Sequence, residues 1–194
     1  MTLPAGLADR ITVAPPSVGP VRLVCVDGPA GAGKTSFAAE LVQALEATHG
    51  PVPVVHGDDV YEGWAVVAGQ TDRVAAFAAL ALRLDTWLIE PFRRGEDARL
   101  PTWDWYAGSW GAPHLVPAAP VVVLEGVALA ARAVREHAAL TVWLDADADV
   151  RLERVLARDG AALREAMLAW QRDEARWHAL DGTRAAADVR VPTT

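Results

Sequence analysis

Lysine and cysteine are almost absent from this sequence. Only one of its 18 basic residues is a lysine, Lys34, and its only thiol is that of Cys25. Because one thiol cannot pair within the chain, an internal disulfide is excluded, and the apolar run around Cys25 predicts a small buried side chain. The position of Lys34 is therefore informative, since every other basic residue is an arginine.

The sequence also has no basic tract and no long apolar run. Its formal net charge is −7, which argues against nucleic acid as the main partner. No apolar stretch reaches the roughly 18 residues that span a membrane, and the first ten residues lack the basic and apolar regions of a signal peptide. We therefore expect a cytoplasmic protein that acts on a small molecule, without a membrane or nucleic-acid partner. A homo-oligomer is compatible with the sequence.

Short apolar runs alternate with segments of helical periodicity from residue 21 onwards. The runs predicted as strands are 21–26, 52–56, 121–124, 140–144 and 189–191. The predicted helices are 36–48, 72–94, 128–137, 148–158 and 161–180, and the proline- and tryptophan-rich segment 96–119 predicts a loop. This alternation indicates an α/β domain whose parallel sheet is covered by helices on both faces.

Residues 1–20 have a different character from the rest of the chain. A short helical pattern over 7–11 is followed by Pro15, Pro16, Gly19 and Pro20. This composition predicts a loosely attached N-terminal arm ahead of one domain over 21–194.

One segment matches the phosphate-binding P-loop pattern Gly-x-x-x-x-Gly-Lys-Thr. It consists of Gly28, Pro29, Ala30, Gly31, Ala32, Gly33, Lys34 and Thr35, and Ser36 follows it. Glycines let the backbone curl so that successive N–H groups point at one anion, and the following helix adds its positive end. The lysine reaches the β- and γ-phosphates, and the threonine hydroxyl binds Mg²⁺. Because the motif joins a predicted strand to a predicted helix, it predicts binding of Mg²⁺ and ATP or a close relative.

Other motifs narrow the class of P-loop protein. A GTPase reads guanine with an Asn-Lys-x-Asp segment, which cannot exist in a chain whose only lysine is Lys34. An ABC-type Ser-Gly-Gly-Gln segment is missing, and the strand over 121–124 ends at Glu125 instead of the aspartate of most ATPase motors. The small-molecule kinases remain.

Carboxylates follow three of the predicted strands. Asp58 and Asp59 come after the second strand, Glu125 after the third and Asp145 after the fourth. Ligands of open parallel sheets bind at this edge, next to the P-loop turn. One carboxylate could deprotonate an acceptor hydroxyl and another could hold Mg²⁺. Helix capping or turn formation is the alternative, because aspartate is favoured there too.

Three arginines lie on one face of the helix predicted over 148–158. Arg151, Arg154 and Arg158 follow one another at spacings of three and four residues, which places their guanidinium groups together. Like charges repel unless an anion lies between them, and a triphosphate suits that position. The alternative is a solvated face paired with neighbouring carboxylates.

Together these segments resemble the uridine kinase-like family of P-loop kinases, over roughly residues 21–191. The segments that carry the resemblance occur in the family's order: the P-loop, His56 to Tyr61, Trp103-Asp104-Trp105, Leu124-Glu125-Gly126, and Arg151 to Asp159. The resemblance implies a three-layer P-loop NTPase sandwich with a five-stranded parallel sheet in the order 2-3-1-4-5. It also implies a helical lid at about 151–180.

The resemblance further implies roles for individual residues. Asp58 would be the catalytic base, and Lys34 and Arg154 would assist the transfer. The residues implied to bind Mg²⁺ are Thr35, Glu125 and Asp58. Those implied to bind the phosphates are the P-loop with Ser36, Arg151, Arg154 and Arg158. Those implied to contact the acceptor are Asp58, Tyr61, Trp103, Asp104 and Trp105.

The sequence departs from the family at the acceptor end. Gly108 occupies the place of a histidine that helps nucleoside kinases of the family read the pyrimidine. Trp103 and Val60 replace a tyrosine and a phenylalanine. The aromatic residues here, which are Trp103, Trp105, Tyr106 and Trp110, could stack on a flat ring or simply pack the loop.

Three functions are therefore open. The first is an ATP-dependent kinase of a nucleoside or another hydroxylated metabolite. The second is a nucleoside monophosphate kinase, for which Arg93, Arg94 and Arg99 could supply cations around the second phosphate. The third is a nucleotide-binding regulatory module without turnover.

Overall fold

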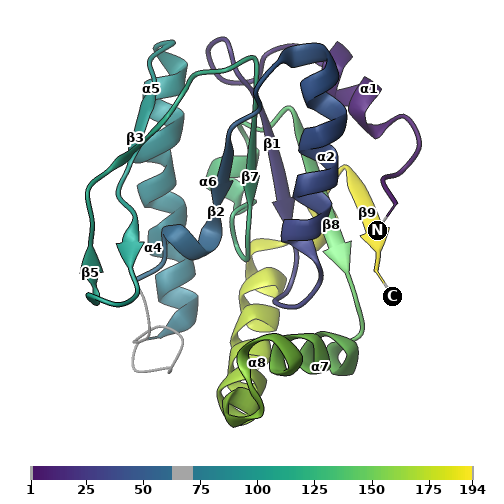
Figure 1. The fold of residues 1–194 in the computed structure, drawn as a ribbon, viewed down its shortest axis with the longest axis vertical. Helices are drawn as coiled ribbons and strands as arrows, with labels where there is room; N and C mark the ends of the chain where they lie inside the picture. Colours follow the sequence, from purple (N-terminus) through teal and green to yellow (C-terminus); the bar gives the residue numbers. More distant parts are fainter. Residues whose placement is uncertain (1, 63–71, 194) are drawn as a thin grey trace.

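A central sheet of five parallel strands organises the computed structural model, which describes residues 2–62 and 72–193 (Figure 1). The strands are β1 (Arg22–Asp27), β2 (Val54–His56), β7 (Val121–Glu125), β8 (Leu140–Asp145) and β9 (Val189–Pro192). They pair in the order β2-β7-β1-β8-β9. Counted among the sheet strands alone, this is the order 2-3-1-4-5, so the predicted fold class is confirmed.

Helices cover both faces of the sheet and complete the three layers. One face carries α1 (Leu7–Val13) and α2 (Lys34–His49). The other carries α4 (Arg73–Leu84), α6 (Arg132–Arg135) and α8 (Arg164–Asp181). Within the described residues, the remaining helical elements are η1 (Gly57–Asp59), the π-helical turn η2 (Asp85–Ile89), α5 (Glu90–Arg93), α7 (Ala148–Asp159), η3 (Ala161–Leu163) and α9 (Thr183–Ala186).

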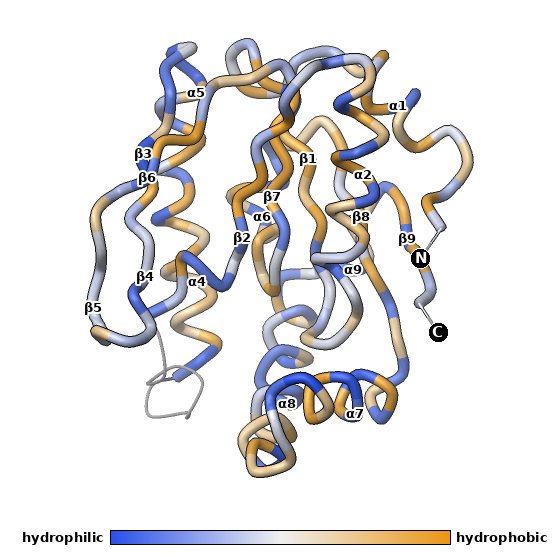
Figure 2. The backbone as a smooth tube through the Cα atoms, viewed as in Figure 1, coloured by the Kyte–Doolittle hydropathy of each residue, from blue (hydrophilic) through white to orange (hydrophobic). Residues whose placement is uncertain are grey.

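Strand β1 shows why the apolar runs of the sequence are continuous. Leu23 and Cys25 pack with α4, α6 and α8, whereas Val24 and Val26 pack with α1 and α2. Successive side chains of a strand point to opposite faces, so a strand buried on both faces needs an apolar residue at every position. The apolar strands accordingly lie in the middle of the molecule (Figure 2).

The loop predicted over 96–119 contains two small antiparallel ribbons. Strand β3 (Ala98–Leu100) pairs with β6 (His114–Val116), and β4 (Trp103–Asp104) pairs with β5 (Ser109–Trp110). Strands of two or three residues are too short to show an alternating pattern, which is why the sequence suggests a loop here.

The helix predicted over 128–137 is also shorter than expected. The fully buried carboxylate of Asp27 accepts hydrogen bonds from the backbone N–H groups of Ala128 and Ala130, at 3.0 and 2.8 Å. These bonds satisfy a carboxylate that is removed from water, and Ala128 adopts a positive φ of 65°. Only the four residues of α6 are therefore helical.

Helix α1 corrects the expectation of a loosely attached arm. Leu7 and Ile11 are buried in the same apolar cluster as Leu41 and Leu45 of α2. The boundary between an arm over 1–20 and a domain over 21–194 stays a prediction. No helix within 2–62 or 72–193 has both the length and the apolarity needed to cross a membrane.

Docking of α1 leads to a stability prediction. Ile11→Ala should lower the free energy of unfolding by about 2–5 kcal/mol, because it removes buried methyl groups and leaves a cavity. The exposed Val13 on the same helix is the control, and Val13→Ala should cost about 0.5 kcal/mol or less. Urea denaturation measures both, and equal costs would show that α1 is not docked in solution.

Helix α8 places a histidine ring against the sheet. The rings of His178 and Trp143 of β8 have their centroids 4.7 Å apart. Both ring nitrogens of His178 are buried and have no hydrogen-bond partner among the described residues. Burial lowers the pKa of His178 below the ordinary value of 6.5, because the charged ring would lose its hydration.

The lowered pKa of His178 predicts a pH-dependent stability. The unfolded chain takes up a proton on this ring at a higher pH than the folded chain does. The stability that depends on a neutral His178 is therefore fully present above about pH 6.5, and it is lost as the pH falls below this value. Denaturation at pH 7.5 and 5.5 should show a larger loss for the wild type than for His178→Phe, and equal losses would contradict the prediction.

Candidate functional site

The P-loop connects β1 to α2 and curls against α7. Gly31 and Gly33 adopt positive φ angles of 79° and 90°. A Cβ atom on Gly31 would lie 2.5 Å from the carbonyl oxygen of Arg151 in α7, so only glycine fits this crossing. The loop therefore has the curled backbone that directs N–H groups at an anion.

Lys34 begins α2 at the end of this loop. Its side-chain amine donates a hydrogen bond of 3.0 Å to the carbonyl oxygen of Pro29. Burial lowers the pKa of Lys34, while the carboxylates of Asp27, Glu174, Glu125 and Asp58, in this order, act in the opposite direction. A buried ammonium group held by one carbonyl is well placed to take a phosphate as a stronger partner.

A cavity of about 640 Å³ opens from the P-loop towards α8. The charged and polar residues that line it include Lys34, Thr35, Ser36, Asp58, Glu125, Arg154 and Arg158. Apolar and aromatic residues line it as well, namely Tyr61, Trp105, Val127, Val155, Leu163, Met167 and Trp170. The cavity thus combines a phosphate-binding loop with the carboxylates of Asp58, Glu125 and Asp159 and an apolar wall.

Glu125 ends β7 and gathers polar groups from two other elements. The Thr35 hydroxyl donates to Glu125 Oε1 at 3.2 Å, and His56 Nδ1, at the end of β2, lies 2.7 Å from the same oxygen. This hydrogen bond raises the pKa of His56. The hydroxyl and carboxylate oxygens are ligands that suit Mg²⁺, which usually takes only one or two protein ligands beside phosphate oxygens.

Asp58 lies in η1, directly after β2, and lines the same cavity. Burial raises the pKa of Asp58, although the nearby Lys34 acts in the opposite direction. A carboxylate with a raised pKa is a better proton acceptor at neutral pH. The indole N–H of Trp105 donates to the backbone oxygen of Asp58 at 3.1 Å, which ties the β4–β5 ribbon to this residue.

The three arginines of α7 do not act alike. Arg154 and Arg158 line the cavity, and Arg154 donates to the carbonyl oxygen of Gly31 at 3.3 Å. Arg158 binds Asp159 through two bonds of 2.7 Å. Arg151 is turned to the P-loop backbone and Glu174, so contact with a phosphate would require it to exchange these bonds.

The aromatic residues of 103–110 mainly pack the ribbon. The ring centroids of Trp103 and Trp110 are 5.2 Å apart, and those of Trp87 and Trp110 are 5.5 Å apart. Tyr106 is fully exposed. Asp104 accepts from two backbone N–H groups of its own turn, at 2.9 Å each. Of the described residues of this ribbon, the cavity lining includes Trp105 alone.

Other predicted residues take structural positions. The Tyr61 ring lines the cavity, but its hydroxyl donates to the carbonyl oxygen of Val127. Asp145 pairs with Arg184 at 2.6 Å, and Asp59 shares η1 with Asp58 without being part of the cavity lining. Of the four carboxylates that follow strands, Asp58 and Glu125 thus meet in one cavity.

Sequence reasoning missed Glu174, Asp27 and His56. Glu174 has a recognisable signal, because it lies within the buried stripe of α8 that also contains Trp170 and Trp177. An acidic residue in an apolar stripe indicates a buried partner. The bonds that join Asp27 to Ala128 and Ala130, and His56 to Glu125, connect residues 69 to 103 positions apart, and no local pattern predicts them.

Two solved structures share this architecture. A candidate uridine kinase from Bacillus stearothermophilus has 18% sequence identity and a TM-score of 0.67, with 95% of this chain and 94% of that chain covered. A candidate fructose transport system kinase from Silicibacter sp. TM1040 has 23% identity and a TM-score of 0.70, with coverage of 99% and 100%. At these identities the likeness shows the fold.

Sequence comparison adds the family. No curated protein matches the sequence. The model of the phosphoribulokinase/uridine kinase family matches residues 23–165, which include the P-loop, Asp58, Glu125 and the arginines of α7. The match spans most of the chain and every element of the phosphate end of the cavity, and the chain therefore belongs to the phosphoribulokinase/uridine kinase family.

Proposed function

We propose that this protein is an ATP-dependent kinase that phosphorylates a hydroxyl group of an uncharged small molecule, such as a nucleoside or a related metabolite. The observation that carries the proposal is one cavity in which the P-loop, the carboxylate of Asp58 and an apolar wall meet. The polar part suits a triphosphate, and the apolar part suits the body of an acceptor without charge.

The phosphate end supports ATP and Mg²⁺ as the second substrate and its metal. Lys34 and the backbone N–H groups of the P-loop would bind the phosphates, with Arg154 and Arg158 closing from α7. Thr35 and Glu125 would hold Mg²⁺, which neutralises part of the phosphate charge when bound. Within the described residues no cluster of three acidic, histidine or cysteine ligands exists, which fits a metal held largely by phosphate oxygens.

Asp58 is the proposed general base. It would accept the proton of the acceptor hydroxyl while that oxygen attacks the γ-phosphorus and the bond to the β-phosphate oxygen breaks. Lys34 and Arg158 would stabilise the charge that develops on the transferred group. The raised pKa of Asp58 favours this role, because the carboxylate binds the proton more readily than one with an ordinary pKa does.

A monophosphate acceptor is less well supported. Arg93 pairs with Glu90 at 2.8 Å, and Arg94 pairs with Glu96 at 2.9 Å. Both belong to the α5 region, at the opposite end of α4 from α7 and α8 (Figure 1). Arg99 belongs to β3 and is not part of the cavity lining. The segment 63–71, beyond the described residues, contains no lysine, arginine or histidine in its sequence.

A regulatory module without turnover is the third alternative. Such a module could lose the base or a metal ligand without losing nucleotide binding. In this chain Lys34, Asp58 and Glu125 line the same cavity, so the groups needed for transfer accompany those needed for binding. The complete set favours an enzyme.

The role of Asp58 gives the first test of function. Asp58→Asn should lower turnover about 100-fold or more, which is the usual contribution of a general base, with little change in ATP affinity. The matched control is Asp59→Asn, because the neighbouring carboxylate is not part of the cavity lining. Coupled assay of ADP release and calorimetric ATP binding measure the two effects. Equal turnover in Asp58→Asn and the wild type would exclude Asp58 as the base.

The nature of the acceptor gives the second test. ATP consumption with Mg²⁺ should be higher with nucleosides or small sugars than with nucleoside monophosphates, because the basic residues that line the cavity in the described structure, Lys34, Arg154 and Arg158, are the ones proposed to bind ATP. Lys34→Ala is the blank, since it removes the amine that binds the phosphates. Faster turnover of CMP or UMP than of cytidine or uridine would favour a monophosphate kinase. ATP binding without turnover on any acceptor would favour the regulatory module.

A further inference from the structure

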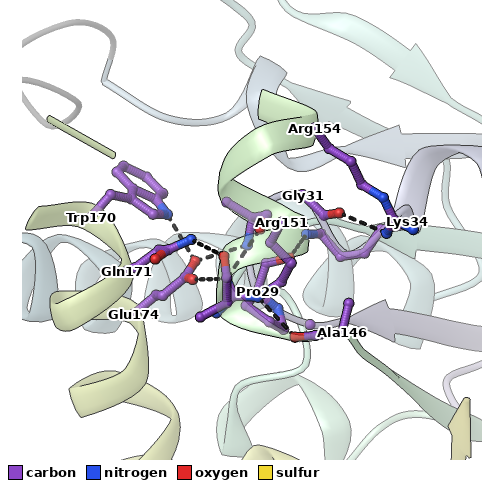
Figure 3. A network of polar contacts seen from close by, with 12 residues as sticks. Pro29, Gly31, Lys34, Ala146, Arg151, Arg154, Trp170, Gln171 and Glu174 are labelled. Atoms are coloured by element: carbon purple, nitrogen blue, oxygen red, sulfur yellow. Dashed lines mark hydrogen bonds and ion pairs between the residues drawn. The ribbon is translucent and has the colours of Figure 1, made fainter. Parts of the chain in front are cut away.

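A buried carboxylate of α8 reaches the backbone of the P-loop. The side chain of Glu174 is only 1% exposed. Its Oε2 atom accepts hydrogen bonds from the backbone N–H of Ala30 at 2.8 Å and from the indole N–H of Trp170 at 2.9 Å. Figure 3 shows Glu174 and Trp170 projecting from α8 towards the loop. One carboxylate oxygen therefore joins the P-loop to a residue of the cavity wall.

Arg151 completes the connection from the opposite side. It donates to the second oxygen of Glu174 at 2.6 Å and to the carbonyl oxygen of Ala30 at 3.1 Å. Its Nε atom donates to the carbonyl oxygen of Ala146, at 3.1 Å, in the segment that leads from β8 into α7. Both backbone polar groups of Ala30 are thus held by a single buried ion pair.

This arrangement constrains a loop that has little rigidity of its own. Glycines at 28, 31 and 33 leave the backbone free to change conformation, and a phosphate site requires one particular curl. A buried ion pair is costly to break, because removal of one partner leaves the other charge without compensation. The Arg151–Glu174 pair can therefore hold the loop in its curled conformation before a nucleotide arrives.

We propose that Glu174 is a positioning residue that fixes the P-loop and the Trp170 wall relative to each other. The inference rests on the proposed kinase function, since it concerns the same cavity. Helix α8 would then be an anchored part of the phosphate site, and Glu174 would act through Ala30 and Trp170 without touching a substrate. Loss of the carboxylate should loosen the loop and weaken nucleotide binding even though the P-loop sequence is intact.

The test is the isosteric variant Glu174→Gln, compared with a variant that breaks another buried ion pair of α8. Asp181 pairs with Arg135, and the two side chains are 8% and 11% exposed, which is similar to Glu174 and Arg151. Asp181→Asn should therefore lower the melting temperature by a similar amount. The Asp181 carboxylate bonds Arg132, Arg135 and Thr183 and, within the described residues, no group of the P-loop, so the ATP affinity of Asp181→Asn should equal that of the wild type.

Glu174→Gln should weaken the binding of ATP with Mg²⁺ about tenfold or more, which corresponds to the loss of one charge-assisted hydrogen bond. It should also accelerate hydrogen exchange in the peptide that contains residues 28–35. Both measurements are made on the folded protein well below its melting temperature, without any acceptor. Wild-type ATP affinity and exchange in folded Glu174→Gln would overturn the proposal.

A second variant separates the two contacts of the same oxygen. Trp170→Phe removes the indole N–H but leaves Ala30 and Arg151 bound to Glu174, so ATP affinity should change less than twofold while the KM for the acceptor rises. A tenfold loss of ATP affinity in Trp170→Phe would contradict the inference that the contact with Ala30 supports ATP binding and the contact with Trp170 supports acceptor binding. Because ATP binding is measured without turnover, a wild type that binds ATP but phosphorylates nothing would refute the kinase function alone.

Discussion

Burial of one ammonium group is the constraint around which this site is built. Lys34 is removed from water at the start of α2, and an unpaired buried charge is strongly unfavourable. Four carboxylates compensate the charge of this amine: Asp27 at the end of β1, Asp58 in η1, Glu125 at the end of β7 and Glu174 in the middle of α8. Each of these carboxylates in turn needs hydrogen-bond partners of its own. The need for polar partners therefore extends from Lys34 into the sheet and the helices.

Local features of the sequence were sufficient for the fold class and for much of the phosphate end. Continuous apolar runs predict strands buried on both faces, and the P-loop pattern predicts the position of its strand, its helix, Lys34 and Thr35. The order of the sheet was predicted only from the resemblance to the uridine kinase-like family. The orientation of Arg151 could not be predicted, because it depends on Glu174, 23 positions later. The same holds for the segment 128–131, whose conformation depends on Asp27.

The acceptor end was harder to predict for a different reason. Aromatic residues spaced along a short ribbon can face a cavity or one another, and the choice depends on where the ribbon docks. Here the Trp105 indole bonds to the backbone of Asp58, while Trp103 and Trp110 pack together. The phosphate end is built from backbone and charged groups, and the acceptor end from apolar walls. Under the proposed function, acceptor specificity can therefore change through the β4–β5 ribbon, whereas changes in α8 near Glu174 would also affect the P-loop.

The scarcity of lysine has a practical consequence for chemical labelling. Lys34 carries the only side-chain amine of the chain, and it lines the cavity. Because burial lowers its pKa, a larger fraction of this amine is unprotonated and nucleophilic at neutral pH than for an exposed lysine. An acylating reagent small enough to enter the cavity would modify one lysine side chain, and the mass of the peptide that contains Lys34 would report directly whether that cavity is occupied.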